Sequence, residues 1–437
     1  MEEVKAKVTD FLNKNEMNPA DIDMENTCRL FLQEMEKGLA AEKSSLAMLP
    51  TYIETERQIP LDKPVIVMDA GGTNFRVATV TFDREGNSKI ENFKLFSMPG
   101  VKQQVGKDEF FKTMAGYLDE VVDKSANIGF CFSYPIEIFP NKDGRVLFFS
   151  KEIKADEVAG NMIGENLNAA ISTSGNAGKK NIILLNDTVA TLLAGRADVK
   201  GMSFETYIGF ILGTGTNCSY IEANKNITKT KDLDLAKSQI VNVESGGFGR
   251  APQGKIDKEF DRSSNSPGRY TFEKMISGAY LGPVCLWTVR AAAEQGLLSK
   301  DSAEKLKQIK EITTKDVSDF MSYPEARGGP LSSALKNASR DELATAYYLI
   351  DRLIERAAKL TAINLSSVAI KSGKGRNPCR PVCIVAEGTT FYQLKSLKQR
   401  VEFYLKDYLV NQKGVFCEII NVENATLIGA AIAGLTN

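Results

Sequence analysis

Two apolar segments, each broken by a glycine-rich turn, constrain the fold of this chain most strongly. The first turn, Asp69-Ala70-Gly71-Gly72-Thr73-Asn74, separates the apolar runs Val65–Met68 and Val77–Phe82. The second turn, Gly213-Thr214-Gly215-Thr216-Asn217, follows the apolar run Ile208–Leu212. Glycine has no Cβ, so the bare backbone N–H groups of such turns can approach an anionic group. We therefore predict that the two turns face each other and hold the phosphates of a nucleotide between two domains.

The bulk composition is that of an ordinary globular protein. A chain of 437 residues has room for two or three domains, and 43% of its residues are hydrophobic. Lys+Arg and Asp+Glu balance at 55 each, so no global field attracts nucleic acid or a membrane surface. No apolar run approaches the ~18 residues of a membrane span. The charged N-terminus lacks a secretion signal, and the seven scattered cysteines suggest reduced thiols, so we expect a cytoplasmic protein.

Histidine is absent from the sequence. This excludes Ser-His-Asp and Cys-His hydrolases, zincins and histidine general bases. Acid–base chemistry must then come from Asp, Glu, Lys, Tyr or Cys. A zinc site made of cysteines alone is doubtful too, because only Cys379 and Cys383 lie close together in the sequence.

Hydrophobic periodicity predicts strands that alternate with helices after a helical start, which indicates an α/β architecture. We expect each half of the chain to begin with strand, glycine turn and strand, as in a distant duplication. The expected helices are segments within 1–60, 110–122, 157–171, much of 260–370 including 343–361, and 427–435. The expected strands are 65–68, 77–82, 90–96, 128–132, 147–149, 182–185, 207–212, 218–221 and 382–385. The basic loop 371–380 is either a solvated connector or a binding patch.

The predicted domain organisation follows from these elements. Residues 1–64 form a helical part of a large domain, and residues 65–189 form a small α/β domain. Residues 190–425 form the rest of the large domain. The C-terminal helix, 426–437, returns to the small domain.

Several common nucleotide-binding signatures are missing. The sequence contains no G-x-x-x-x-G-K-[ST], so it does not encode a P-loop ATPase. Gly213 and Gly215 lack the third glycine of a dinucleotide fold, and a strand follows them where a helix should. The H-R-D element of protein kinases is impossible without histidine.

A third informative segment is Asn186-Asp187-Thr188, where a buried strand ends and a helix begins. Two interpretations are open for Asp187. It can be a helix N-cap, which stabilises a helix by about 1 kcal/mol. It can also be a carboxylate that points into the cleft between two domains and acts as a general base.

The ordered set of motifs resembles the hexokinase family, in the actin/Hsp70-like fold. The two turns are similar to the family's phosphate motifs, and Asn186-Asp187-Thr188 is similar to its catalytic-base motif. Three segments resemble its sugar-contacting elements, and Ser150-Lys151 stands where the family usually has Thr-Lys. These three segments are Phe132-Ser133-Tyr134-Pro135, the stretch from Asn242 to Gly249, and the stretch from Phe272 to Gly282.

The resemblance implies a role for each matching residue. Asp187 would be the general base for the 6-hydroxyl of a hexose, and Lys151 would offset charge on the transferred phosphoryl group of MgATP. Asp69 would orient Mg²⁺ through water. The residues implied in sugar binding are Ser133, Ser150, Lys151, Asn186, Asp187, Asn217, Glu244 and Glu273. The residues implied in ATP binding are Asp69, Gly71, Gly72, Thr73, Asn74, Arg76, Gly213, Thr214, Gly215, Gly388 and Thr389.

The chain also departs from the family pattern. Ser245 replaces the tryptophan that follows the sugar-binding glutamate, which alters the packing behind the sugar. Glu387 stands where the adenosine motif usually has Asp, and the glycine-rich C-terminal element is reduced to Thr426–Ala431. The adenosine side is therefore the weaker match.

Three functions remain open from the sequence. The first is an ATP:D-hexose 6-phosphotransferase, with glucose as the expected hexose. The second is a non-catalytic sugar-binding regulator on the same fold. The third is a kinase for another sugar, such as fructose, mannose or an N-acylated hexosamine.

Overall fold

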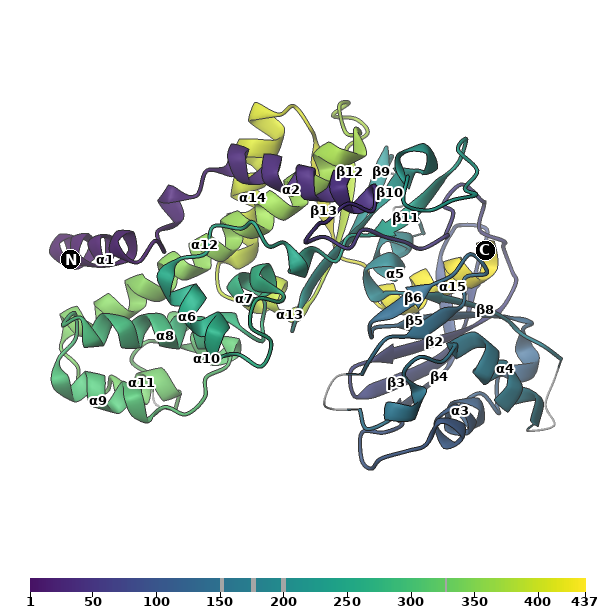
Figure 1. Cartoon of the computed structure of the whole chain (residues 1–437), viewed down its shortest axis with the longest axis horizontal. Coiled ribbons are helices and arrows are strands. Elements are labelled where there is room, and N and C mark those ends of the chain that lie inside the picture. Colours follow the sequence, from purple (N-terminus) through teal and green to yellow (C-terminus); the bar gives the residue numbers. More distant parts are fainter. Residues whose placement is uncertain (150–152, 174–177, 198–201, 327) are drawn as a thin grey trace.

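The computed structural model describes residues 1–149, 153–173, 178–197, 202–326 and 328–437 (Figure 1). Ser150 and Lys151, both predicted to bind the sugar, lie outside these described residues. Two separate β-sheets organise the molecule, and helices cover both of them. Within the described residues, no helix is long and apolar enough to cross a lipid bilayer.

The first sheet contains the first glycine turn. Its strands are β2 (Val65–Gly71), β3 (Asn74–Phe82), β4 (Ser88–Ser97), β5 (Asn127–Phe132) and β8 (Asn181–Leu185). They lie in the order β4-β3-β2-β5-β8, with β2 antiparallel to β3 and parallel to β5. The helices α3 (Lys107–Gly116) and α4 (Ile163–Thr173) and a small ribbon, β6 (Ile136–Ile138) with β7 (Gly144–Val146), belong to the same lobe.

The second sheet repeats this arrangement around the second glycine turn. Its strands are β1 (Leu49–Pro50), β9 (Thr206–Leu212), β10 (Thr216–Ala223), β11 (Ser238–Asn242), β12 (Val382–Glu387) and β13 (Cys417–Ile420). Their order is β1-β11-β10-β9-β12-β13, with β9 antiparallel to β10 and parallel to β12. Apart from β1, strand order and direction match the first sheet, which supports the interpretation of a distant duplication.

Strand β2 is buried on both faces, which explains its continuous apolar run. Ile66 and Met68 point into a core shared with α3 and α4. Val65 and Val67 point the other way, into a core shared with two short helices, α5 (Asp187–Ala194) and α15 (Ala425–Thr436). The strand therefore holds the first turn rigidly between two cores.

The helices α5 and α15 lie against each other between the two sheets (Figure 1). Each crosses to the other sheet: α5 packs on β9 and β10, and α15 packs on β2 and β5. Two glycines allow this approach. A Cβ on Gly429 would lie 1.8 Å from the carbonyl oxygen of Ala190, and a Cβ on Gly129 would lie 1.8 Å from that of Ala430. The domain boundaries at 64, 189 and 425 stay predictions.

The remaining helices build the lobe around the second sheet. They are α1 (Glu2–Lys14), α2 (Met24–Leu39), α6 (Lys255–Ser263), α7 (Thr271–Ile276), α8 (Leu281–Glu294), α9 (Lys300–Gln308), α10 (Thr314–Ser322), α11 (Pro330–Ala334), α12 (Arg340–Ser372), α13 (Thr389–Gln393) and α14 (Leu397–Tyr404), which continues as a π-helix over Leu405–Gln412. The central helix, α12, begins with a Ser339/Glu342 capping box and ends at Gly373, whose φ is +67°. It packs against α1, α2 and β10.

The structure corrects several sequence-based expectations. Segment 147–149 is not a strand. Leu147 and Phe148 are apolar, which favours a buried strand, but both side chains are half exposed. The helix expected over 110–122 ends at Gly116, and the one expected over 157–171 begins only at Ile163. Residues 40–60 contain no helix. The predicted α/β fold with two related halves is confirmed.

Candidate active site

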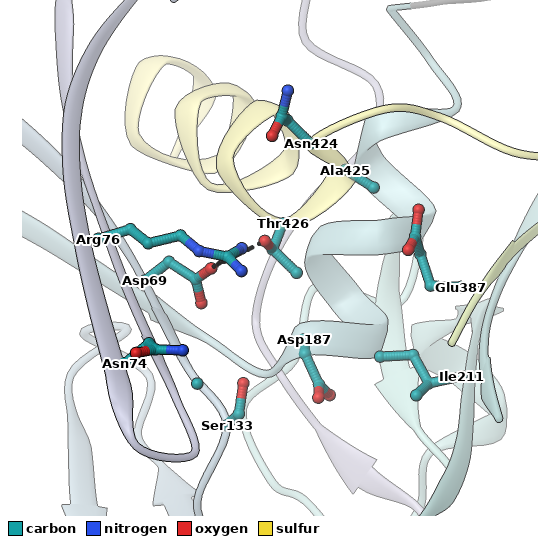
Figure 2. Close-up of a pocket in the computed structure, with 11 residues that line it drawn as sticks. Asp69, Asn74, Arg76, Ser133, Asp187, Ile211, Glu387, Asn424, Ala425 and Thr426 are labelled. Atoms are coloured by element: carbon teal, nitrogen blue, oxygen red, sulfur yellow. Dashed lines mark hydrogen bonds and ion pairs between the residues drawn. The ribbon is translucent and has the colours of Figure 1, made fainter. Parts of the chain in front are cut away.

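A cavity of about 290 Å³ opens where the first glycine turn, α5 and α15 meet (Figure 2). Both helices present their N-terminal ends to it, so two positive dipole ends point at the same space. The lining residues are Asp69, Gly71, Asn74, Arg76, Ser133, Asp187, Ile211, Glu387, Asn424, Ala425 and Thr426. The two helix N-termini favour an anionic group such as phosphate, whereas the acids Asp69, Asp187 and Glu387 in the same lining oppose it.

Asp187 is the first residue of α5 and faces this cavity beside Ser133 (Figure 2). The capping interpretation is wrong in one respect, because Asn186 is the N-cap and accepts the Thr188 N–H at 3.0 Å. Asp187 Oδ1 accepts the same N–H at 2.8 Å. Burial raises the pKa of Asp187 to about 7; the Thr188 N–H opposes this shift, and the charges of Glu244 and Asp69 add to it.

Asp69 is buried at the end of β2 and holds two partners with one oxygen. Its Oδ2 atom accepts the Thr426 hydroxyl at 3.0 Å and forms an ion pair with Arg76 at 3.2 Å (Figure 2). Burial raises the pKa of Asp69, while the Arg76 charge and the Thr426 hydroxyl oppose that rise. The carboxylate is thus held in place at the cavity wall by strands β2 and β3 and by α15.

The candidate sugar residues on the second sheet form a hydrogen-bonded cluster. Asn217 and Asn242 both donate to Glu244 Oε1, at 3.1 and 2.7 Å, and Asn217 also donates to Asn242 Oδ1 at 2.7 Å. Glu244 has a φ of +58°, a left-handed conformation that costs about 1–3 kcal/mol outside glycine. Burial raises the pKa of Glu244, and its two asparagine donors oppose the rise.

Glu273, on α7, lies next to this cluster. Its Oε2 atom accepts the N–H of Thr216, in the second glycine turn, at 2.9 Å. A Cβ at Gly215 would lie 2.6 Å from that oxygen, so a larger residue there would displace the Glu273 carboxylate. Burial raises the pKa of Glu273 to about 7, and the Glu244 charge contributes to the shift. The three carboxyl groups of Asp187, Glu244 and Glu273 are therefore coupled electrostatically.

The second glycine turn lines a different cavity, of about 340 Å³. Gly213 O accepts the Gly278 N–H at 2.8 Å and the Thr390 hydroxyl at 2.9 Å, which ties three segments together. Gly388 has a φ of +115°, and a Cβ there would lie 2.3 Å from Leu212 O. The lining residues are Thr214, Gly278, Ala279, Thr313, Thr314, Lys315, Ser318, Asp319, Thr389, Thr390, Gln393 and Leu394.

The predicted site residues thus fall into three groups. Asp69, Gly71, Asn74, Arg76, Ser133 and Asp187 share the first cavity. Asn217, Glu244 and Glu273 lie around Thr216, and the charge of Glu244 acts on Asp187. Thr214 and Thr389 line the second cavity. Gly71 and Asp187 do not line it. Gly72, with a φ of +56°, and Thr73 are exposed at the tip of the first turn.

Sequence patterns missed several residues of the site. Thr426 was noted only as part of a reduced C-terminal element, although it donates to Asp69. Asn242 belongs to a matched segment but had no assigned role, and it donates to Glu244. Thr313, Ser318 and the other polar residues of α10 in the second cavity carried no recognisable signal, because short polar side chains at a helix start are common.

The described residues contain no group of three or more Cys, Asp or Glu side chains that could enclose a metal ion. The donor set fits a magnesium ion that keeps most of its water, since Mg²⁺ is usually bound through one or two carboxylates and substrate phosphates. Asp69 is a buried carboxylate that lines the first cavity.

Comparison with known proteins first places the fold. The structure of hexokinase from Schistosoma mansoni complexed with glucose superposes with a TM-score of 0.79, at 24% identity, over 99% of both chains. The fold is therefore that of the two-domain actin-like sugar kinases, as predicted.

The sequence comparisons then give the family. Two sequence models, both described as hexokinase, match residues 7–197 and 207–436. Hexokinase of Schistosoma mansoni is 30% identical over 320 residues, covering 69% of each chain. Human hexokinase-2 is 28% identical over 386 residues, which are 83% of this chain but 41% of the human protein. The chain belongs to the hexokinase family.

Proposed function

We propose that this protein is an ATP-dependent hexokinase that phosphorylates the 6-hydroxyl of a hexose, with glucose as the expected substrate. The observation that carries the proposal is Asp187, a carboxylate with a pKa raised to about 7 in a cavity that two helix N-termini face. A general base works best when its pKa lies near the working pH. The glucose bound to the similarly folded Schistosoma mansoni hexokinase supports the choice of sugar.

In the proposed reaction, Asp187 accepts the proton of the 6-hydroxyl while that oxygen forms a bond to the γ-phosphorus of ATP. The bond between the γ-phosphorus and the β,γ-bridging oxygen breaks, and ADP leaves. Phosphoryl transfer depends mainly on alignment and charge stabilisation. Arg76 and the N-terminal ends of α5 and α15 favour negative charge in the first cavity. Lys151, which lies outside the described residues, would offset charge on the transferred phosphoryl group.

Ser133, Asn186, Asn217, Glu244 and Glu273 would bind the sugar hydroxyls, with Ser150 as a further candidate. Amides and carboxylates suit this task, because each sugar hydroxyl both donates and accepts hydrogen bonds. A raised pKa of about 7 lets Glu273 take either role near neutral pH.

The two cavities would divide the nucleotide between them. Its phosphates would lie near the first turn, and the second cavity beside Thr214 and Thr389 would take the adenosine. Magnesium, when bound through water to Asp69, would neutralise phosphate charge. We also propose that the protein is located in the cytoplasm.

The test is ADP formation by the purified protein with Mg²⁺ and each of glucose, mannose, fructose, glucosamine and N-acetylglucosamine. We expect ADP only when both Mg²⁺ and a hexose are present, with the highest kcat/KM for glucose. Sugar binding without turnover would instead identify a non-catalytic regulator. The highest kcat/KM on another sugar would replace glucose as the substrate.

A further inference from the structure

Asn364 lies at full depth in the protein on α12, with no exposed surface. A buried amide is stable only when its donor and acceptor atoms have partners. Asn364 Nδ2 donates to Ser245 Oγ at 3.2 Å, and Asn364 Oδ1 accepts the Cys218 thiol at 3.3 Å. Both partners are themselves completely buried. A polar link therefore joins the middle of α12 to strand β10 and to the turn that follows β11.

These two segments continue the link to the candidate sugar site. The backbone N–H groups of Cys218 and Ser245 both donate to Asn217 Oδ1, at 2.7 and 3.2 Å. This fixes the orientation of the Asn217 amide, because its oxygen is occupied and its nitrogen must point the other way. That nitrogen donates to Glu244 Oε1 at 3.1 Å.

The backbone conformation of Glu244 shows what this link stabilises. A left-handed glutamate persists only when its surroundings hold it there. Ser245 is the next residue and opens the 3₁₀ turn Ser245–Gly247. Its side chain is the anchor that Asn364 holds, at the position where the family pattern has tryptophan. Where the resemblance implies a tryptophan, this chain has a serine that is hydrogen-bonded to α12.

We propose that Asn364 is a positioning residue for hexose binding, acting through Ser245 to hold Asn217 and the strained Glu244 in their binding geometry. The inference rests on the proposed function, in which Glu244 and Asn217 bind the sugar. Asn364 lines neither the first nor the second cavity, and we expect it to act on the hexose through these two side chains.

The test measures KM for the hexose and for MgATP in Asn364→Leu, which keeps the side-chain size but removes both hydrogen-bonding atoms. We expect the hexose KM to rise at least about tenfold, while kcat and the KM for MgATP stay within about twofold. Ser367→Ala is the matched control. Ser367 is equally buried on the same helix, and its hydroxyl donates to Ile363 O at 2.7 Å. This control should lower Tm without changing the hexose KM.

A second variant separates positioning from folding. Ser245→Ala should raise the hexose KM by a similar factor. In the double variant Ser245→Ala/Asn364→Leu, the hexose KM should be no higher than in the more affected single variant, because both substitutions break the same link. An unchanged hexose KM in Ser245→Ala overturns the inference, even if Asn364→Leu does not fold. The inference is also overturned if the hexose KM rises no more in Asn364→Leu than in Ser367→Ala. If the unaltered protein neither binds nor phosphorylates a hexose, it is the proposed function that fails.

Discussion

Thr426 donates its hydroxyl proton to Asp69 Oδ2 at 3.0 Å, although 357 residues separate the two in the chain. The same oxygen is paired with Arg76, so β2, β3 and α15 converge on one carboxylate. Because α15 also packs against α5, which carries Asp187, the proposed magnesium-binding acid and the proposed general base share one support.

Replacement of Thr426 by valine tests this support. Valine keeps the shape of threonine but loses the hydroxyl, and a hydrogen bond to a charged group contributes about 1.5–3 kcal/mol. We expect kcat/KM for MgATP to fall about tenfold or more, with the KM for hexose little changed. Thr436→Val, at the other end of α15, is the control, because its hydroxyl donates only within the helix, to Ile432 O. Equal effects of the two substitutions on MgATP would contradict the assignment of Asp69.

Replacement of Asp187 tests the general base. Asp187→Ala should lower kcat at least about 10²-fold, because it removes the carboxylate proposed to accept the hydroxyl proton. Asp187→Asn should do the same while keeping the side-chain shape. Calorimetry should show hexose binding largely unchanged in both variants. Undiminished turnover in either one would refute the role of Asp187.

The raised pKa of Asp187 predicts how activity depends on pH. A general base must be deprotonated, so kcat/KM should fall about tenfold for each pH unit below about 7 and level off above it. A rate measured from pH 5 to 9 gives this profile. The residual activity of Asp187→Ala should lack the inflection near 7, and an inflection that persists would assign it to another group.

The same shift predicts a cost in stability. The folded-state pKa of Asp187 lies above its usual value of 3.8, so between about pH 4 and 7 the folded state binds a proton that the unfolded state has released. The stability that this proton contributes is lost as pH rises through about 7. Asp187→Asn should therefore have a higher Tm than the unaltered protein at pH 8, and the difference should shrink at pH 5. A Tm difference that does not change with pH would show that burial does not raise the pKa of Asp187.

Gly388 offers a test of the second cavity. In Gly388→Ala the new Cβ would meet Leu212 O at 2.3 Å and Gly213 N at 2.7 Å, which pushes the second glycine turn out of place. We expect a raised KM for ATP together with a lower Tm. Gly296→Ala also has a positive φ, +83°, but its Cβ would meet nothing within 4 Å. It should lower Tm through backbone strain alone and leave the KM for ATP unchanged.

Sequence patterns predicted the α/β fold and both glycine turns, because strands such as β2 and β9 are locally apolar and end at residues that only a turn accommodates. They failed where local preference and tertiary role differ. Leu147 and Phe148 are apolar but half exposed, and β11 carries polar residues such as Gln239, which is buried and bonded to Asn224 and to the N–H of Tyr52. A polar residue in a buried strand carries no periodic signal when its partner is distant.

The sequence by itself determined which chemical groups are available: no histidine, two glycine turns, and acids placed after strands in the order typical of the hexokinase family. Only the tertiary structure decided how these groups behave. The pKa of Asp187 depends on burial beside Glu244 and Asp69, the orientation of Asp69 depends on Thr426, and the strained Glu244 depends on its asparagine partners. The physical reason is that burial and hydrogen bonding act through space, over a few ångströms, between residues that may be hundreds of positions apart in the chain.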